Sequence, residues 1–419
     1  MDVKPLHVIL ILVLFGGLLA LALWGATESR RIQGPSDLRI DRLDRLHVRI
    51  NRQIFVYNNA STLVDTYALD KFGIEQLLGS YDFYSDNSML LSPASIHAPA
   101  GTDEFNEGAT SKHIGKLLRC SLDSGACTAL EKSVLSFKQS FRAFVDQADD
   151  IYLADTASGS VYWLNEEGGV RHELSRVLDR PSQIRRYDDV LVVAHTEGQE
   201  LVLVPLRDGR FGDEEDWQRI AMTDPGNRTR SETRPIDFTR IEKDWYVLAK
   251  TQDMRSGAIY RYDPTGTLRA HFALPAGADP FALEDFGGAI VVADYVGMAV
   301  HRYSPAGDHL GYLSSTTQDE YVAGLKPRLE RATALGPLQQ TVWQWHNKRG
   351  VFIALLLGVI ILLPLAIAVQ GDWAKNRFEQ WLQTQPECQV AGALVPHPQH
   401  TQAINSLMSP NEKAGNASD

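Results

Sequence analysis

The sequence contains few cysteines, no familiar reaction motif and no excess of positive charge. Its 419 residues include three cysteines, too few for a disulfide-built scaffold and too scattered for a zinc site. Its 41 Lys and Arg are outnumbered by 52 Asp and Glu, which gives a formal net charge of −11. Nucleic-acid binding is excluded, because it requires a basic surface that displaces counterions from phosphates. A hydrophobic content of 44% indicates a folded chain.

The short motifs of common enzyme classes are missing. There is no Gly-x-Ser-x-Gly, no Gly-x-x-x-x-Gly-Lys and no Cys-x-x-Cys. His172-Glu173 begins like a zinc motif, but Arg176 stands where the second histidine is required. The acidic run 213–216 lacks the alternation of a calcium loop. We therefore assign no catalytic residue, metal ligand or cofactor, and we favour a non-enzyme while leaving an activity open.

Two apolar runs are long enough to cross a membrane. Residues 6–26 and 350–371 contain no Asp, Glu, Lys or Arg. As helices that rise about 1.5 Å per residue, they are roughly 31 Å long, the thickness of a bilayer hydrocarbon core. We predict a transmembrane helix over each run. The first exceeds the apolar stretch of a signal peptide and lacks a small-residue cleavage site after it, which favours an uncleaved signal anchor.

Small residues in both runs predict contact between the two helices. Such residues at fourfold spacing line one helix face and allow close backbone approach. They are Gly350, Ala354 and Gly358 in the second run, and Gly16, Gly17 and Ala20 in the first. The alternative is that Gly and Ala are simply common in membrane helices.

A strand pattern recurs between the runs. An alternating apolar strand ends in a polar residue, and a glycine-containing turn, a second alternating strand and another glycine turn follow. The copies cover residues 150–170, 289–308, 245–267 and 190–210, a degraded copy at 53–74, and one that starts at 88 and continues at 114–127. Six units between residues 46 and 313 are about 45 residues each, the length of a four-stranded propeller blade. The fold class is therefore an all-β six-bladed β-propeller flanked by two transmembrane α-helices.

The clearest copies, ALEDFGGAIVVADYVGMAVHRYSPAG and DDIYLADTASGSVYWLNEEGG, resemble the NHL repeat and its six-bladed relatives. The resemblance covers two units well and four loosely. It implies a propeller but not a function, because such propellers serve as scaffolds, ligand binders and occasional hydrolases. Asp155 and Asp294 end their strands, and we interpret them as structural carboxylates that accept backbone N–H bonds in the next turn.

The cysteines bear on location. Cys120 and Cys127 flank a short turn, and a hairpin turning at 123–124 places them opposite each other, within reach of a disulfide. Two reduced cysteines are the alternative. Cys388, near the C-terminus, has no partner and fits a reducing compartment. Positive charges near the runs slightly favour a cytoplasmic propeller, but long domains translocate largely regardless of charge. We predict a bacterial inner-membrane protein with a periplasmic propeller and both termini cytoplasmic.

The resulting organisation has eight parts. They are an N-terminal tail (1–5), transmembrane helix 1 (6–26), a linker (27–45), the propeller (46–313), a helical linker (314–349), transmembrane helix 2 (350–371), an interfacial amphipathic helix (372–385) and a disordered tail (386–419). Aromatic side chains favour the membrane interface. We therefore expect Trp343, Trp345, Trp373 and Trp381 to lie there.

The function predicted from these features is that of a non-catalytic protein-interaction scaffold or an accessory subunit of a membrane-protein complex. Its partners would be the lipid bilayer and a membrane or envelope protein, with no nucleic acid. One alternative is a hydrolase that resembles the six-bladed lactonases, which hold a central divalent metal with Glu, Asn and Asp; that set cannot be placed in this sequence. Another is a periplasmic ligand sensor, although the short C-terminal tail offers no output domain. The partner, ligand and oligomeric state are not evident from the sequence.

Overall fold

The computed structural model describes residues 5–96, 113–222, 233–251, 256–338, 375–377 and 380. The chain divides into two compact units, one formed by Ala26–Ala334 and the other by Met1–Gly25 with Leu335–Asp419. Helix α1 (Pro5–Arg31) covers the first apolar run, and its last residues belong to the larger unit. Within the described residues, no helix combines the length and the hydropathy that a membrane crossing requires. The transmembrane helices therefore stay a prediction from the sequence.

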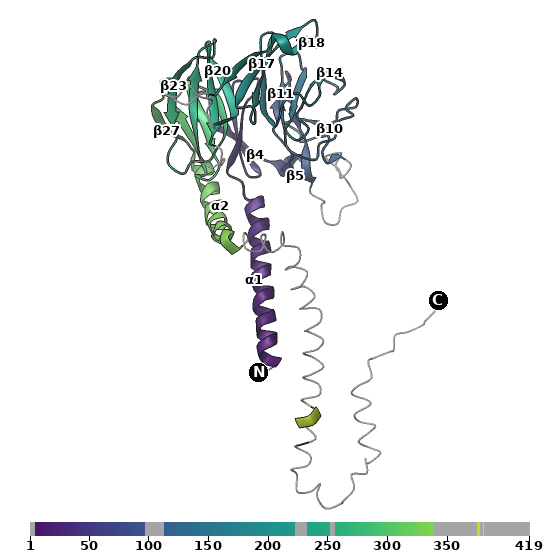
Figure 1. The fold of residues 1–419 in the computed structure, drawn as a ribbon, viewed down its shortest axis with the longest axis vertical. Coiled ribbons are helices and arrows are strands. Elements are labelled where there is room, and N and C mark those ends of the chain that lie inside the picture. The colour runs from purple at the N-terminus through teal and green to yellow at the C-terminus, as the bar shows by residue number, and fades with distance from the viewer. Residues whose placement is uncertain are drawn as a thin grey trace, which may run out of the picture. The chain divides into compact units, whose positions relative to one another are not determined.

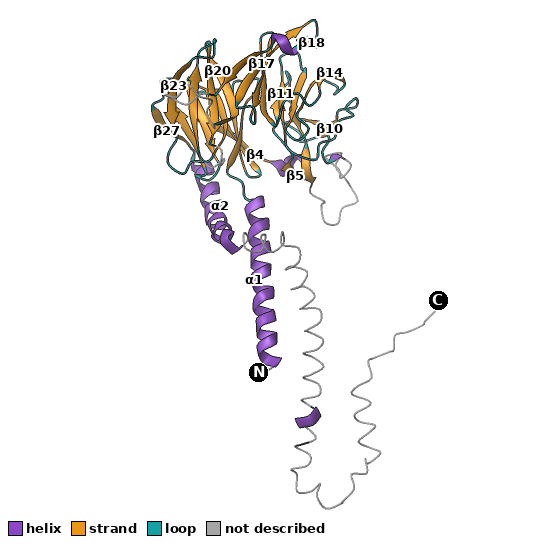
Figure 2. Ribbon diagram, in the orientation of Figure 1, coloured by secondary structure: helices purple, strands orange, loops and turns teal. Residues whose placement is uncertain are grey.

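The larger unit is a six-bladed β-propeller, as predicted (Figures 1 and 2). Each blade is an antiparallel sheet whose strands follow one another in the chain, except that β8 interrupts blade 2 to pair with β5. Blade 1 contains β1 (Pro35–Ile40), β2 (Leu46–Ile50), β3 (Gln53–Tyr57) and β4 (Leu63–Ala68). Blade 2 contains β6 (Asp82–Phe83), β7 (Met89–Leu91), β9 (Leu118–Cys120) and β10 (Cys127–Ala129). Blade 3 contains β11 (Phe141–Val145), β12 (Ile151–Asp155), β13 (Ser160–Leu164) and β14 (Val170–Leu174).

The second half of the ring repeats this arrangement. Blade 4 contains β15 (Pro181–Tyr187), β16 (Val190–His195), β17 (Glu200–Arg207) and β18 (Arg210–Phe211), and β19 (Gln218–Ala221) also pairs with β17. Blade 5 contains β20 (Arg234–Ile241), β21 (Asp244–Lys250), β22 (Gly257–Tyr262) and β23 (Leu268–Ala273). Blade 6 contains β24 (Pro280–Phe286), β25 (Ala289–Asp294), β26 (Ala299–Tyr303) and β27 (His309–Leu313). A small sheet of β5 (Ile74–Leu77) and β8 (Pro93–Ile96) accompanies blade 2, and helix α2 (Thr316–Ala334) follows blade 6.

Blades stack because both faces of their middle strands are apolar. In β12, Ile151 and Leu153 pack in a cluster with Leu90 of blade 2. Their neighbours Tyr152 and Ala154 belong to a different cluster, which includes side chains of blade 4. Neither face of the blade is left in water, and this burial drives the ring together.

The ring begins earlier than the sequence suggested. β1 lies within residues 27–45, which the sequence analysis assigned to a linker. Its sequence, PSDLRI, does not read as a buried strand because Asp37 and Arg39 alternate with apolar residues. Both charged side chains are nevertheless buried.

Among the strands that the structure describes, none pairs blade 1 with blade 6, so side chains close the ring. Leu38, Val48 and Phe55 of blade 1 form one apolar cluster with blade 6 and with Leu325 of α2. We call this junction of blades 1 and 6, together with α2, the seam. Helix α2 packs along it with partly buried side chains, including Tyr321.

Polar contacts fix α2 onto the seam. The hydroxyl of Tyr57 donates a 2.6 Å hydrogen bond to Gln318 Oε1, and Asn51 Nδ2 donates to the Tyr321 hydroxyl at 3.3 Å. Arg328 of α2 forms an ion pair with Glu28 of α1. The helix that follows blade 6 is thus bonded to blade 1 and to the chain segment before it.

Candidate functional site

The ring axis is the first candidate site, because the inner strand of every blade brings charged side chains toward it. Arg185 of blade 4 forms a 2.5 Å ion pair with Glu284 of blade 6, two blades away. The same guanidinium lies 3.3 Å from Asp237 Oδ1 of blade 5. A side chain can reach two blades along only by crossing near the axis. The other charged members of this axial network are Asp37, Arg39, Asp82 and Arg142.

Burial governs the electrostatics of the axis. Desolvation raises the pKa of Glu284 to about 7, although the neighbouring Arg185 guanidinium acts to lower it. Desolvation raises the pKa of Asp82 in the same way, and it lowers the pKa of Arg142. In the low dielectric of the axis, every charge that loses its partner is expensive.

Axial carboxylates also bond the backbones of neighbouring blades. Asp82 Oδ2 accepts a 2.7 Å hydrogen bond from Val145 N of blade 3. Asp237 Oδ2 accepts a 2.9 Å bond from Leu283 N of blade 6. These carboxylates satisfy backbone N–H groups on the inner edge of the next sheet, where sheet pairing ends. The axial network therefore joins the blades.

The axis does not fit the divalent metal of a lactonase-type enzyme. Guanidinium groups of Arg39, Arg142 and Arg185 lie among the carboxylates, and Arg39 Nη1 is 3.4 Å from Asp37 Oδ1. The described ranges contain no group of three or more His, Cys, Asp or Glu side chains placed to hold a metal ion. Asp37 is the least satisfied member of the network, since neither of its carboxylate oxygens accepts a hydrogen bond from the described part of the chain.

A cavity of about 660 Å³ between blades 1 and 2 is the second candidate. His47 and Tyr67 line it: His47 Nε2 lies 2.9 Å from Asp41 Oδ2, and His47 Nδ1 lies 2.8 Å from the Tyr67 hydroxyl. Burial acts to raise the pKa of Asp41, but hydrogen bonds from His47 and Arg45 hold it well below its usual range. The ionised carboxylate fixes the proton on Nε2, so the Tyr67 hydroxyl donates to Nδ1.

Comparison of blade 1 with blade 3 indicates that the Asp41–His47 pair has a structural role. In blade 3, Asp146 begins the equivalent turn and accepts backbone N–H bonds from Ala148 and Asp150, as Asp41 does from Leu43 and Arg45. The Tyr152 hydroxyl, one strand along as His47 is in blade 1, lies 3.5 Å from Asp146 Oδ2. Burial also lowers the pKa of His47 and raises that of Tyr67 well above its ordinary value, which opposes a reactive imidazolium or phenolate.

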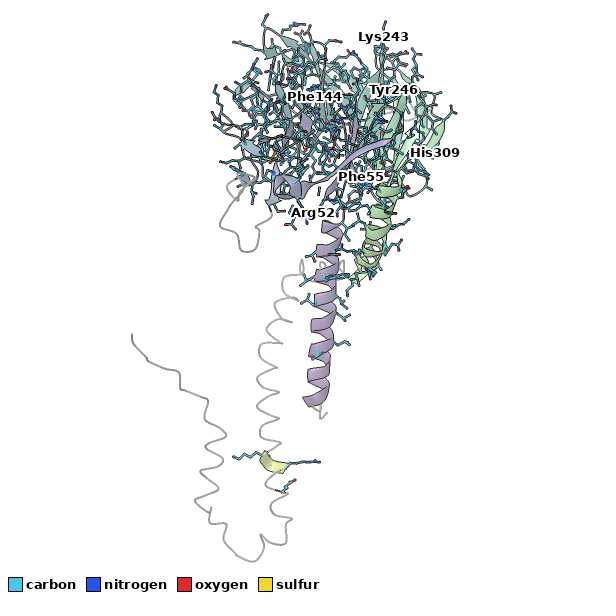
Figure 3. All side chains as sticks on the ribbon, turned by 180° about the vertical axis from the view of Figure 1, so that it is seen from behind. Arg52, Phe55, Phe144, Lys243, Tyr246 and His309 are labelled. Carbon is cyan, nitrogen blue, oxygen red and sulfur yellow. A yellow bond between two sulfur atoms is a disulfide. The ribbon has the colours of Figure 1, made fainter. Side chains whose placement is uncertain are left out.

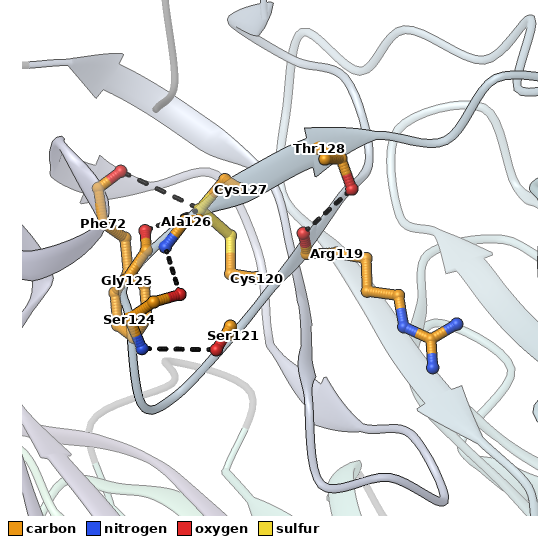
Figure 4. The surroundings of a disulfide bond; sticks show 9 residues. All are labelled: Phe72, Arg119, Cys120, Ser121, Ser124, Gly125, Ala126, Cys127 and Thr128. Carbon is orange, nitrogen blue, oxygen red and sulfur yellow. Dashed lines mark hydrogen bonds between the residues drawn. A yellow bond between two sulfur atoms is a disulfide. The ribbon is translucent and has the colours of Figure 1, made fainter. Parts of the chain in front are cut away.

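The predicted disulfide is present (Figure 4). Cys120 of β9 and Cys127 of β10 are paired residues of one hairpin, and their Cα atoms are 4.1 Å apart. The turn between them is fixed by Ser121, whose carbonyl accepts a 3.0 Å bond from Gly125 N. Gly125 has φ of +75°, and a Cβ there would lie 2.3 Å from the carbonyl oxygen of Lys71, so this turn requires glycine.

The other residues singled out by the sequence fall into two groups. Asp155 Oδ1 accepts a 3.0 Å bond from Ala157 N, and Asp294 Oδ1 accepts bonds from Asp279 N and Gly297 N. Gly16, Gly17 and Ala20 lie in α1. Gly350, Ala354, Gly358, Trp343, Trp345, Trp373 and Trp381 lie outside the described residues.

Comparisons with known proteins add little beyond the architecture. No protein-family model matches the sequence, and no curated protein matches it in sequence. Among solved structures, a catalytically inactive virginiamycin B lyase from Staphylococcus aureus with quinupristin has 12% identity and a TM-score of 0.44, over 67% of this chain and 85% of that chain. A gluconolactonase from Xanthomonas campestris has 13% identity and a TM-score of 0.43, over 63% and 84%. BamB from Moraxella catarrhalis has 12% identity and a TM-score of 0.37, over 66% and 74%. Similarity at this level carries no argument about function.

Sequence reasoning missed the axial network. Its members lie in strands that read as weak, such as Gln183-Ile184-Arg185 in β15 and Glu284-Asp285 in β24. A signal was nevertheless present, because at least one charged residue lies in the first strand of every blade, at intervals of 43 to 60 residues. That signal becomes visible only after the blades have been aligned by their structure.

Proposed function

We propose that this chain is a membrane-anchored propeller that acts as a non-catalytic interaction scaffold, an accessory subunit of a membrane-protein complex. The observation that carries the proposal is the use of the axial charges. Arg185 bonds blade 4 to blades 5 and 6, and Asp82 bonds blade 2 to blade 3. Because the axial charges bond the blades to one another, they have a structural role. We therefore place partner binding on the outer surface of the propeller.

The anchoring part of the proposal rests on the sequence. The runs 6–26 and 350–371 have the length and the lack of charge of membrane spans. We place the propeller in a bacterial periplasm and both termini in the cytoplasm. The Cys120–Cys127 disulfide supports an oxidising compartment for the propeller.

Orientation is testable through the cysteines. In intact cells, a membrane-impermeant maleimide should leave Cys388 unlabelled, and permeabilisation should expose it. A variant with Cys388→Ser and Val134→Cys moves the reactive thiol from the C-terminal segment to the propeller. Val134 suits this purpose because 85% of its surface is exposed. Its new thiol should react in intact cells once the outer membrane is permeable. Labelling of Cys388 alone under these conditions would place the propeller in the cytoplasm.

The scaffold role is testable by photo-crosslinking in native membranes. A photoreactive amino acid replaces Leu43, Val170 or Leu310, which are exposed on blades 1, 3 and 6. Tyr152, fully buried, is the matched control position. We expect a discrete crosslinked species of defined mass from at least one outer position and none from the control. Absence of any intermolecular adduct, together with a monomeric mass in mild detergent, contradicts the scaffold.

A further inference from the structure

A bulge recurs between the third and fourth strands of the blades. In blade 6, Tyr303 pairs with His309 and Arg302 pairs with Gly311, so Leu310 is an extra residue. The same register shift occurs in blades 1, 3 and 5. The extra residue places His309 and Tyr312, three positions apart, on the same face of the sheet, and bulges commonly re-aim side chains in this way.

Blade 6 departs from the repeat at two positions next to this bulge. The first position is on the third strand, two residues before the residue that pairs next to the bulge. The second position is on the fourth strand, directly before the extra residue. The other bulged blades place Phe55 and Leu63, Tyr162 and Val170, or Tyr260 and Leu268 there. Blade 6 has His301 and His309. Two imidazoles thus replace one aromatic and one aliphatic side chain.

The two histidines and Asp294 form a chain of contacts. His301 Nδ1 lies 3.3 Å from His309 Nε2, and His301 Nε2 lies 3.3 Å from Asp294 Oδ2. Asp294 Oδ1 accepts hydrogen bonds from the backbone N–H groups of Asp279 at 2.9 Å and Gly297 at 3.0 Å, which fixes the carboxylate beside His301. A carboxylate oxygen accepts hydrogen bonds, so His301 donates to Asp294 from Nε2, and the lone pair of Nδ1 is directed at His309.

We propose that His301 Nδ1 and His309 Nε2 bind a divalent transition metal, with Zn²⁺ the best fit. Two nitrogens bound tetrahedrally at about 2.0–2.1 Å from zinc lie about 3.3–3.4 Å apart. The 3.3 Å separation meets this requirement. Asp294 then orients the buried ligand from its second ring nitrogen, as carboxylates do in many zinc sites.

The site is open on its outer side. His301 is 2% exposed, whereas His309 lies on the exposed edge strand β27 at the rim of the propeller (Figure 3). Tyr312 and Asp294 line an adjoining cavity of about 490 Å³, which reaches the start of α2. The described residues provide no third ligand. Two protein ligands leave the remaining positions to water or to a donor from another molecule.

The test uses the full-length protein in detergent with a purification tag free of histidine. Isothermal titration with ZnCl₂ measures stoichiometry, and Co²⁺ in place of Zn²⁺ reports tetrahedral nitrogen coordination through its visible absorption. We expect one ion per chain, a rise in Tm with added Zn²⁺, and loss of both signals in His309→Leu. This variant restores the residue type that blades 1 and 5 carry at the same position, so its fold should hold. Its unfolding temperature without metal checks that.

Two further variants sharpen the result. Asp294→Asn should weaken Zn²⁺ binding by about 10–100-fold while the stoichiometry stays at one, because it loosens a ligand without removing it. His271→Ala, which removes an exposed histidine packed at a tilt against Tyr260 in blade 5, should leave binding unchanged. No stoichiometric binding by the unmodified chain, or equal binding by His309→Leu, shows that the two imidazoles share only a hydrogen bond and overturns the proposal. Neither outcome bears on the scaffold role.

Discussion

The ring is held together by opposite means at its axis and at its seam. At the axis, buried ion pairs such as Arg185–Glu284 connect blades across the centre. At the seam, apolar side chains of blades 1 and 6 pack with α2, and a few hydrogen bonds fix the helix in place. Ion pairs are costly to break because a stranded charge stays buried, whereas apolar contacts weaken in proportion to the surface lost. A single substitution at the axis should therefore cost more stability than a single substitution at the seam.

The largest expected effect comes from Arg185→Met, which strands the carboxylates of Glu284 and Asp237 at the axis. Removing one partner of a buried ion pair costs about 3–5 kcal/mol, and here two carboxylates lose the same guanidinium. Urea unfolding of the full chain, followed by tryptophan fluorescence, measures the loss. Arg207→Met, at an exposed ion pair with Asp216, is the matched control and should cost less than about 1 kcal/mol. Equal losses of unfolding free energy in the two variants would show that the axial ion pairs contribute no more than an exposed pair.

The second effect is a pH dependence that belongs to the axis alone. The pKa of Glu284 is raised to about 7 in the folded protein, against about 4.3 for an unperturbed glutamate. The stabilisation from its folded-state protonation is complete below the unfolded pKa and is lost as pH rises through about 7, a change of about 3.5 kcal/mol. Stability measured from pH 4 to 8 should fall across this window. In Glu284→Gln the loss of stability between pH 4 and 8 should be smaller by the contribution of this one carboxyl group. An unchanged pH profile would show that other groups cause the loss.

At the seam, Leu325→Ala should cost about 2–3 kcal/mol, the lower part of the range for a buried leucine, because a helix at a surface can partly collapse onto the gap. Leu325 is 7% exposed in the apolar cluster. The control is Leu310→Ala on β27, where half of the side chain is already in water, and we expect a change within about 0.5 kcal/mol. A loss at Leu325 no larger than this would mean that α2 does not stabilise the ring.

The smallest expected effect comes from Tyr57→Phe, which deletes the hydrogen bond to Gln318 and leaves the ring in place. The typical contribution of such a bond is about 0.5–1.5 kcal/mol. Hydrogen exchange of α2 amides should rise more than exchange in blade 3, because the bond fixes this helix. Uniform acceleration across the propeller would indicate a global rather than a seam effect.

The same comparison shows how far sequence reasoning extends. The middle strands of blades 3 and 6 were predicted because Ile151–Asp155 and Ala289–Asp294 are apolar runs with a polar end. The disulfide was predicted because Cys120 and Cys127 share one hairpin. β1 was missed, since Asp37 and Arg39 read as exposed residues although both are buried at the axis, where Arg39 Nε donates to the carbonyl of Tyr81, 42 positions away. Local periodicity separates exposed positions from buried apolar ones, but it cannot show that a buried charged side chain bonds to a residue 42 positions away.

The order of strands in the blades has a mechanical consequence. Five of the six junctions between blades are crossed by the polypeptide itself, so covalent bonds back up their side-chain contacts. No such covalent link joins blade 1 to blade 6, because these blades are formed by the first and the last strands of the propeller sequence. The Glu28–Arg328 pair, the Tyr57 hydroxyl and the packing around Leu325 are therefore among the non-covalent contacts that close the ring at this junction.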